Sequence, residues 1–137
     1  MDFQLTDEQI SLKKKVRDLA VKQIAPMVEN WEKEGLMNDQ EMMPAYKNLG
    51  LLGMTLPKEY GGGGRSVFDA ILVIEELARL STIASMPVFE TSVGPIRVVE
   101  KFGTEEQKKR FIPPCCTGEK LMAVAMTEPE AGSALTD

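Results

Sequence analysis

The stretch that decides the fold is Ala123–Asp137, which reads AVAMTEPEAGSALTD. It belongs to a continuous apolar run, Leu121–Met126, which predicts a short buried strand. Thr127-Glu128-Pro129 ends the run, and the small residues after it predict a turn over Glu130–Ser133. A strand followed by such a turn can place backbone N–H groups and a hydroxyl against a flat or phosphorylated ligand. The same composition also suits an ordinary surface loop.

The residues before this stretch predict helices. Apolar residues recur every three or four positions from Leu12 to Val28, which predicts one buried face of a long helix, with a kink or break at Pro26. Trp31 extends this face and is interpreted as a core residue. Ala70–Leu80 is so apolar that it predicts the central helix of a bundle. Three places have the spacing of an N-terminal capping box, namely Thr6 with Gln9, Ser66 with Asp69, and Thr104 with Gln107.

Prolines and glycines set the expected boundaries. Gly35 is predicted to end the first helical region, and Asn38 or Asp39 to begin the next helix, which tolerates Pro44 only in its first turn. This helix is expected to bury Tyr46 and Leu49 and to stop at Gly50 or Gly53. Pro87 and Pro95 are expected to interrupt the chain, and Ile112-Pro113-Pro114 to end a short helix over Glu105–Phe111. The result is a bundle of roughly four to six helices.

The glycine run Gly61–Gly64 is not a phosphate-binding loop by sequence. No Lys-Ser/Thr pair follows it, its spacing does not fit GxGxxG, and Pro57 stands where a strand would be needed. We interpret the run as a flexible connector.

The composition of the chain argues against several functional classes. The chain has 137 residues, a formal net charge of −5 and no histidine, which argues against a protein that binds nucleic-acid phosphates. No apolar segment approaches the ~20 residues of a membrane span, and the acidic start is unlike a signal peptide. The adjacent Cys115 and Cys116 suit neither a disulfide nor a metal site, so we expect reduced, buried thiols and a cytoplasmic location.

The string Met126-Thr127-Glu128-Pro129-x-Ala131-Gly132-Ser133 resembles the flavin-side signature of the acyl-CoA dehydrogenase family. The similarity extends through the chain in family order. It includes four further blocks: the opening Phe3-x-Leu5-Thr6-x-Glu8-Gln9, Leu49–Gly53 with Pro57–Gly62, Glu75–Ala78, and Gly103–Lys108 with Gly118–Lys120. One departure is Ala134, which stands where the family usually has Asp.

The resemblance implies a mainly α fold that ends in one β-strand. Residues 1–120 would form the N-terminal helical domain, and residues 121–137 would supply the first strand and flavin-binding turn of a middle β-domain. The family continues with a C-terminal helical domain and usually assembles as a tetramer. Because the predicted strand has no partner strand in this sequence, either the chain is a portion of a longer protein, as we expect, or a second chain supplies the sheet.

The resemblance also implies a function. Family members bind FAD, oxidise an acyl-CoA thioester between its α and β carbons, and pass electrons to an electron-transfer flavoprotein. Carried over by position, Val124, Met126 and Thr127 would lie on the flavin-ring side. Gly132 and Ser133 would lie at the pyrophosphate, with Ser133 also on the acyl-CoA side. Plain strand packing remains an alternative for the two apolar residues, and local turn capping for the two hydroxyls.

No residue of this sequence matches the family's catalytic glutamate, and we read neither Glu128 nor Glu130 as the base. We therefore expect the chain alone to be inactive and name no catalytic residue or metal ligand. Reductase, oxidase and monooxygenase variants of the chemistry remain open. A non-catalytic helical module that docks onto a partner flavoprotein is the alternative from another functional class.

Overall fold

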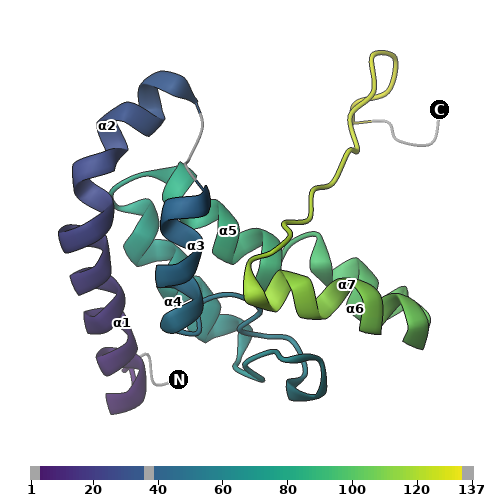
Figure 1. Cartoon of the computed structure of the whole chain (residues 1–137), viewed down its shortest axis with the longest axis horizontal. Coiled ribbons are helices and arrows are strands. Elements are labelled where there is room, and N and C mark those ends of the chain that lie inside the picture. The colour runs from purple at the N-terminus through teal and green to yellow at the C-terminus, as the bar shows by residue number, and fades with distance from the viewer. Residues whose placement is uncertain (1–3, 36–38, 134–137) are drawn as a thin grey trace.

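The computed structural model describes residues 4–35 and 39–133, and almost all of its regular structure is helical (Figure 1). The predicted mainly α fold is therefore confirmed. Among these described residues there are seven α-helices, which are α1 (Asp7–Leu19), α2 (Ala25–Glu34), α3 (Asp39–Asn48), α4 (Val67–Ala78), α5 (Thr82–Ser92), α6 (Ile96–Phe102) and α7 (Glu105–Thr117). Within the described ranges, none of these helices is long and apolar enough to cross a bilayer.

All three predicted capping boxes form. Thr6, Ser66 and Thr104 each accept a hydrogen bond from the backbone N–H three residues later, and the side chain of that later residue accepts one from the capping residue's N–H. These reciprocal bonds satisfy two otherwise unpaired donors at each helix start. They fix the first residues of α1, α4 and α7.

The long first helix is interrupted, as Pro26 predicts. A π-helical segment, η1 (Ala20–Ile24), lies between α1 and α2, and the N–H of Ala25 bonds the carbonyl of Ala20, five residues back. Pro26 follows immediately in the first turn of α2, where its missing N–H costs little. α2 ends at Gly35, which has a φ of 65°, so the predicted stop at this glycine is also confirmed.

Several predicted breaks were wrong. Pro87 lies inside α5, and α7 continues through Pro113 and Pro114 to Thr117. Burial explains the difference, because the residues around these prolines pack into the core; they are Val88 on α5 and Ile112, Cys115 and Cys116 on α7. Tertiary packing of an apolar face then outweighs the lost backbone hydrogen bond. Leu49 was also predicted wrongly, since it is 39% exposed beyond the end of α3.

The helices enclose one larger and one smaller core cluster. The larger cluster is built on α4, which packs against both α1 and α5, so its predicted central position is confirmed. Trp31 is only 2% exposed and belongs to the larger cluster, as predicted. The smaller cluster joins α6 and α7 to a 3-10 turn, η2 (Lys58–Tyr60), and consists of Leu56, Tyr60, Ile96, Ile112, Cys115 and Cys116.

The glycine run is an ordered, tightly packed loop, so its interpretation as a flexible connector was wrong. The N–H groups of Gly62, Gly63 and Gly64 donate to the carbonyls of Pro57, Gly53 and Leu56, at 3.1, 3.0 and 2.9 Å. A Cβ on Gly62 would lie 2.3 Å from the carbonyl oxygen of Leu56. Glycine is needed here because backbone packs directly on backbone.

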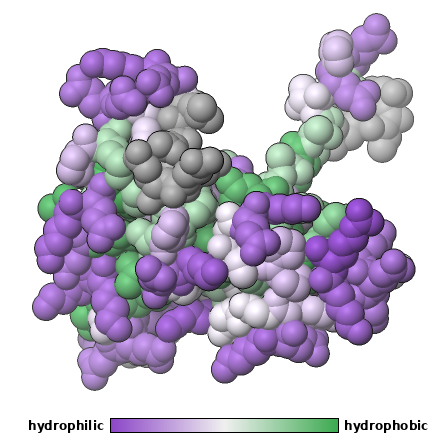
Figure 2. All heavy atoms as spheres, viewed as in Figure 1, coloured by the Kyte–Doolittle hydropathy of each residue, from purple (hydrophilic) through white to green (hydrophobic). Residues whose placement is uncertain are grey.

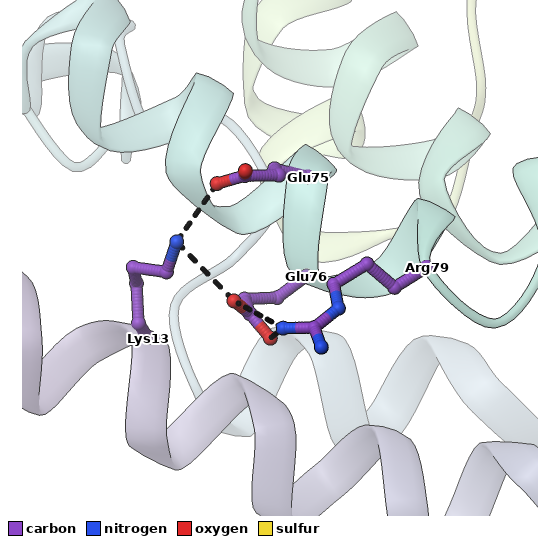
Figure 3. A network of polar contacts seen from close by, with 4 residues as sticks. All are labelled: Lys13, Glu75, Glu76 and Arg79. Atoms are coloured by element: carbon purple, nitrogen blue, oxygen red, sulfur yellow. Dashed lines mark hydrogen bonds and ion pairs between the residues drawn. The ribbon is translucent and has the colours of Figure 1, made fainter.

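A group of four charged side chains joins α1 to α4 (Figure 3). Lys13 Nζ lies 2.8 Å from Glu75 Oε2 and 3.2 Å from Glu76 Oε1. Arg79 reaches the same Glu76 carboxylate at 3.4 Å. The Glu76 side chain is 5% exposed, and the Glu75 side chain is 58% exposed. The hydrogen bond that Lys13 donates to Glu75 lowers the pKa of Glu75 and raises the pKa of Lys13.

The two adjacent cysteines are free thiols buried in the smaller cluster, as predicted. Burial raises the pKa of Cys116 to about 11. Cys116 therefore stays protonated near neutral pH and acts as a packing residue rather than a nucleophile.

Candidate functional site

The segment after α7 leaves the helical body as an extended stretch (Figure 1). The predicted strand Leu121–Met126 forms no ladder with any described residue, and Val124 and Met126 are 51% and 57% exposed instead of buried. The prediction of a buried strand is wrong for this structure, because a strand requires hydrogen-bonding neighbours and the helical body offers none.

The predicted turn forms, but two residues earlier than expected. The N–H of Glu128 donates to the carbonyl of Ala131 at 2.9 Å, and the N–H of Ala131 donates back to Glu128 at 3.2 Å. These bonds place Pro129 and Glu130 at the centre of a two-residue hairpin loop. Gly132 and Ser133 follow the loop and are exposed, and a Cβ on Gly132 would meet nothing within 4 Å. Ala134 lies outside the described residues.

An apolar pocket of about 400 Å³ lies where this segment passes α5 and α6. Met86 and Phe89 of α5 and Val98 of α6 contribute to one side, and Val124 and Met126 contribute to the other. Figure 2 shows apolar side chains at the base of the projecting segment and polar ones at its tip. The structure thus brings two of the predicted site residues, Val124 and Met126, against the helical body.

The other three predicted site residues do not line this pocket. Thr127, Gly132 and Ser133 are all exposed. The projecting segment therefore lines the pocket with apolar residues, whereas Thr127, Gly132 and Ser133 lie outside the pocket lining.

The helical wall of the pocket was not predicted from the sequence. α5 has apolar residues on opposite sides, since Ala84 and Val88 are buried while Met86 and Phe89 are 38% and 41% exposed. An apolar helix surface that does not enter the core is the signal that would have indicated a second contact. Gly94 also shapes this wall, because a Cβ there would lie 2.8 Å from the Phe89 ring.

Comparison with known proteins decides the family. The family description "Acyl-CoA dehydrogenase, N-terminal domain" matches residues 6–119. The chain belongs to the acyl-CoA dehydrogenase family. The matched residues contain all seven α-helices, and they end just before the projecting segment.

Two curated relatives of this acyl-CoA dehydrogenase family member carry different activities in their names. The chain is 41% identical over 130 residues to an acyl-CoA dehydrogenase of Bacillus subtilis, covering 94% of this chain and 34% of that protein. It is 38% identical over 135 residues to a 3-sulfinopropanoyl-CoA desulfinase of Paraburkholderia xenovorans, covering 98% and 34%. The chain thus spans about a third of the length of these relatives.

The fold also matches solved structures. An acyl-CoA dehydrogenase from Bacillus anthracis, solved in complex with FAD, superimposes with a TM-score of 0.84 at 32% sequence identity. The match covers 96% of this chain and 22% of that chain. The helical arrangement of this family member is therefore one already seen in a flavin-containing protein.

Proposed function

We propose that this chain is the N-terminal part of an FAD-dependent acyl-CoA dehydrogenase. The enzyme oxidises an acyl-CoA thioester to the 2-enoyl-CoA and passes the electrons to an electron-transfer flavoprotein. The observation that carries the proposal is the apolar pocket that α5 and α6 form with the signature segment. Residues 1–120 would form the helical domain, and residues 121–137 would open the β-domain. The complete enzyme would be a homotetramer.

The exposed residues of the projecting segment fit a bound FAD. Open space surrounds Gly132, and the neighbouring Ser133 is exposed, so a pyrophosphate could approach the backbone N–H groups there. Val124, Met126 and Thr127 would hold the flavin ring side, with Ser133 shared between cofactor and substrate. When bound, FAD supplies the acceptor for the hydride that leaves the β carbon.

The residues of this chain bind and position the cofactor and the substrate, and none of them is assigned a proton transfer. Met86, Phe89 and Met126 exclude water from the acyl chain, which strengthens the electrostatic interactions around the thioester. Glu128 flanks the hairpin loop and Glu130 lies in it; both are exposed and outside the pocket lining, so neither is assigned as the base. The base that removes the α-proton would come from another part of the enzyme.

The 137-residue chain by itself should bind FAD weakly or not at all, because Ala123–Thr127 is exposed and unpaired. After incubation with FAD and dialysis against flavin-free buffer, we expect the chain to be colourless, as measured by its flavin absorbance. Stoichiometric yellow protein would contradict the assignment of this segment as only one part of the cofactor site.

The activity is tested in the flavoenzyme that contains this chain. Anaerobic addition of a panel of straight-chain acyl-CoAs should bleach the flavin. Met126→Ser should weaken acyl-CoA binding several-fold, because it removes an apolar wall of the pocket. Ile10→Ser is the matched control, since Ile10 is 54% exposed on α1 and does not line the pocket.

The same experiment separates the alternatives. The alternative is a non-catalytic module that docks onto a partner flavoprotein, and the exposed apolar residues of the projecting segment favour it. Such a module would give no bleaching with any acyl-CoA. A reductase would require the opposite direction, with reduced flavin reoxidised by a 2-enoyl-CoA. Bleaching by saturated acyl-CoAs supports the dehydrogenase.

A further inference from the structure

One aromatic ring of the pocket wall rests on a residue that has no side chain. Phe89, on α5, and Gly94, in the turn between α5 and α6, both line the pocket beside the projecting segment. A Cβ on Gly94 would lie 2.8 Å from Phe89 Cε1 and 3.0 Å from Phe89 Cζ. Two carbons in contact are normally about 3.5–4.0 Å apart. Any larger residue at position 94 would therefore have to displace the Phe89 ring.

The backbone beneath the ring is held in place by hydrogen bonds. The N–H groups of Val93 and Gly94 both donate to the Phe89 carbonyl, at 3.0 and 2.7 Å. The hydroxyl of Ser92, which is fully buried, accepts a hydrogen bond from the Met54 N–H at 3.0 Å. Breaking buried hydrogen bonds is costly, whereas an aromatic ring can turn about its side-chain bonds. A side chain added at position 94 would therefore move the ring rather than the backbone.

The ring is free to move because core packing does not enclose it. Phe89 is 41% exposed, and Val98, which also lines the pocket, is 57% exposed. Gly94 does not have a positive φ, so its backbone accepts an alanine without strain. Because Phe89 and Gly94 both line the pocket, an added methyl group and the ring that it displaces would together take up pocket space.

We propose that Phe89 limits the length of the acyl chain that the pocket accepts and that Gly94 sets the position of this limit. The inference rests on the proposed function and deepens it, since it assigns two residues that determine substrate specificity. Phe89 contacts the acyl chain directly, whereas Gly94 is a positioning residue that acts through the ring. One methylene more or less in an apolar pocket changes kcat/KM by about tenfold or more.

The test compares dodecanoyl-CoA with butyryl-CoA, whose acyl groups differ only in length, in the flavoenzyme that contains this chain. The quantity measured is the ratio of kcat/KM for the longer substrate to that for the shorter one. Phe89→Ala should raise this ratio at least about tenfold, and Gly94→Ala should lower it about tenfold. Phe102→Ala is the matched control and should leave the ratio unchanged, because Phe102 is 81% exposed and does not line this pocket.

A double variant tests whether Gly94 acts through the ring. In the Phe89→Ala background, Gly94→Ala should change the ratio by less than about twofold, because no ring remains to be displaced. A full effect of Gly94→Ala in that background would overturn the inference, as would an unchanged ratio in Phe89→Ala. If Phe89→Ala does not fold, Phe89→Leu replaces it in both comparisons and should also raise the ratio, by a smaller factor.

The shorter substrate keeps the two proposals distinguishable. Butyryl-CoA should bleach the flavin of the unmodified enzyme and of every folded variant. Bleaching together with a ratio that Phe89 does not control would overturn only the assignment of the length limit. Failure of every acyl-CoA to bleach the unmodified enzyme would overturn the proposed function, and this inference with it.

Discussion

At the scale of single residues, this structure depends on a few places where backbone approaches backbone. Gly62, in the loop between η2 and α4, is the clearest, because a Cβ there would lie 2.3 Å from the Leu56 carbonyl oxygen. The loop also supplies hydrogen bonds that hold Gly53–Leu56 in place. A change at this glycine therefore acts on the smaller core cluster as well as on the loop.

Gly62→Ala should destabilise the chain by about 2–3 kcal/mol, since its Cβ would contact backbone atoms that cannot rotate away. Urea denaturation followed by circular dichroism measures the loss. Gly132→Ala is the control and should change stability little, because nothing lies within 4 Å of the added atom. Equal stability of the two variants would contradict the tight packing of the glycine loop.

Asp69 makes the start of α4 sensitive to acid. Burial would raise the pKa of Asp69, but hydrogen bonds from Gln9 and Ser66, together with the charge of Arg65, lower it below its ordinary value of 3.8. The folded chain thus binds this proton less readily than the unfolded chain. The resulting stabilisation is present above about pH 4 and is lost as the pH falls through the lowered pKa.

Asp69→Asn should therefore lose less stability than the unmodified chain between about pH 7 and pH 3. The urea midpoint of each protein is measured at pH 7 and at pH 3, and the drop between these two pH values is compared between the proteins. Asp18→Asn removes the same charge from the exposed surface of α1 and serves as the control. If the midpoint of Asp69→Asn drops as much between pH 7 and pH 3 as that of the unmodified chain, this carboxylate does not cause the acid sensitivity.

At the scale of helices, the contact between α1 and α4 combines apolar packing with the charged group around Lys13. Its two glutamates are adjacent in sequence but differ in surroundings. Glu76 is buried and contacts both Lys13 and Arg79, whereas Glu75 is largely exposed. Hydrogen bonds that are buried and involve charge contribute more to stability than exposed ion pairs do.

Glu76→Gln should cost about 1–3 kcal/mol of unfolding free energy, and Glu75→Gln should cost clearly less. Both variants remove one negative charge and preserve side-chain size, so each is the control for the other. A double-mutant cycle with Lys13→Met measures the coupling, which should be larger for Glu76. The reverse order would show that exposure does not govern these pairs.

The helices also show which features the sequence could predict. The capping boxes at Thr6, Ser66 and Thr104 were correct because each depends only on residues three positions apart. Pro87 and Pro113 were misleading because their effect depends on what the surrounding helix buries. The pocket wall on α5 was missed for the same reason, since sequence periodicity does not indicate which apolar side contacts the core and which contacts the segment after α7.

At the scale of the whole molecule, the chain consists of a packed helical body and a projecting segment with few contacts. Leu121 and Met122 still pack at the edges of the two core clusters. From Ala123 to Glu130 every residue is exposed. The packed helical body therefore extends to Met122, shortly after the end of α7 at Thr117.

A shortened chain that ends at Met122 should unfold with nearly the same free energy as the 137-residue chain, within about 0.5 kcal/mol. Thermal and urea unfolding measure this directly. A chain that ends at Phe111 is the contrasting variant and should lose most of its stability, because it lacks Ile112, Cys115 and Cys116 of the smaller cluster. A large loss on removing only the projecting segment would contradict the division.

The π-helical segment η1 changes the direction in which the side chains after it point, relative to those of α1. At about 100° per residue, an uninterrupted α-helix would turn Trp31 roughly 100° away from Leu12, which lies nineteen positions earlier. The wide turn accommodates one surplus residue, so both side chains reach the larger cluster. Deleting Val21, which is 49% exposed, should therefore convert η1 to regular α-helix and preserve the fold. Deleting the exposed Lys14 should unfold the chain, because no wide turn lies between Leu12 and Val16 to absorb the missing residue.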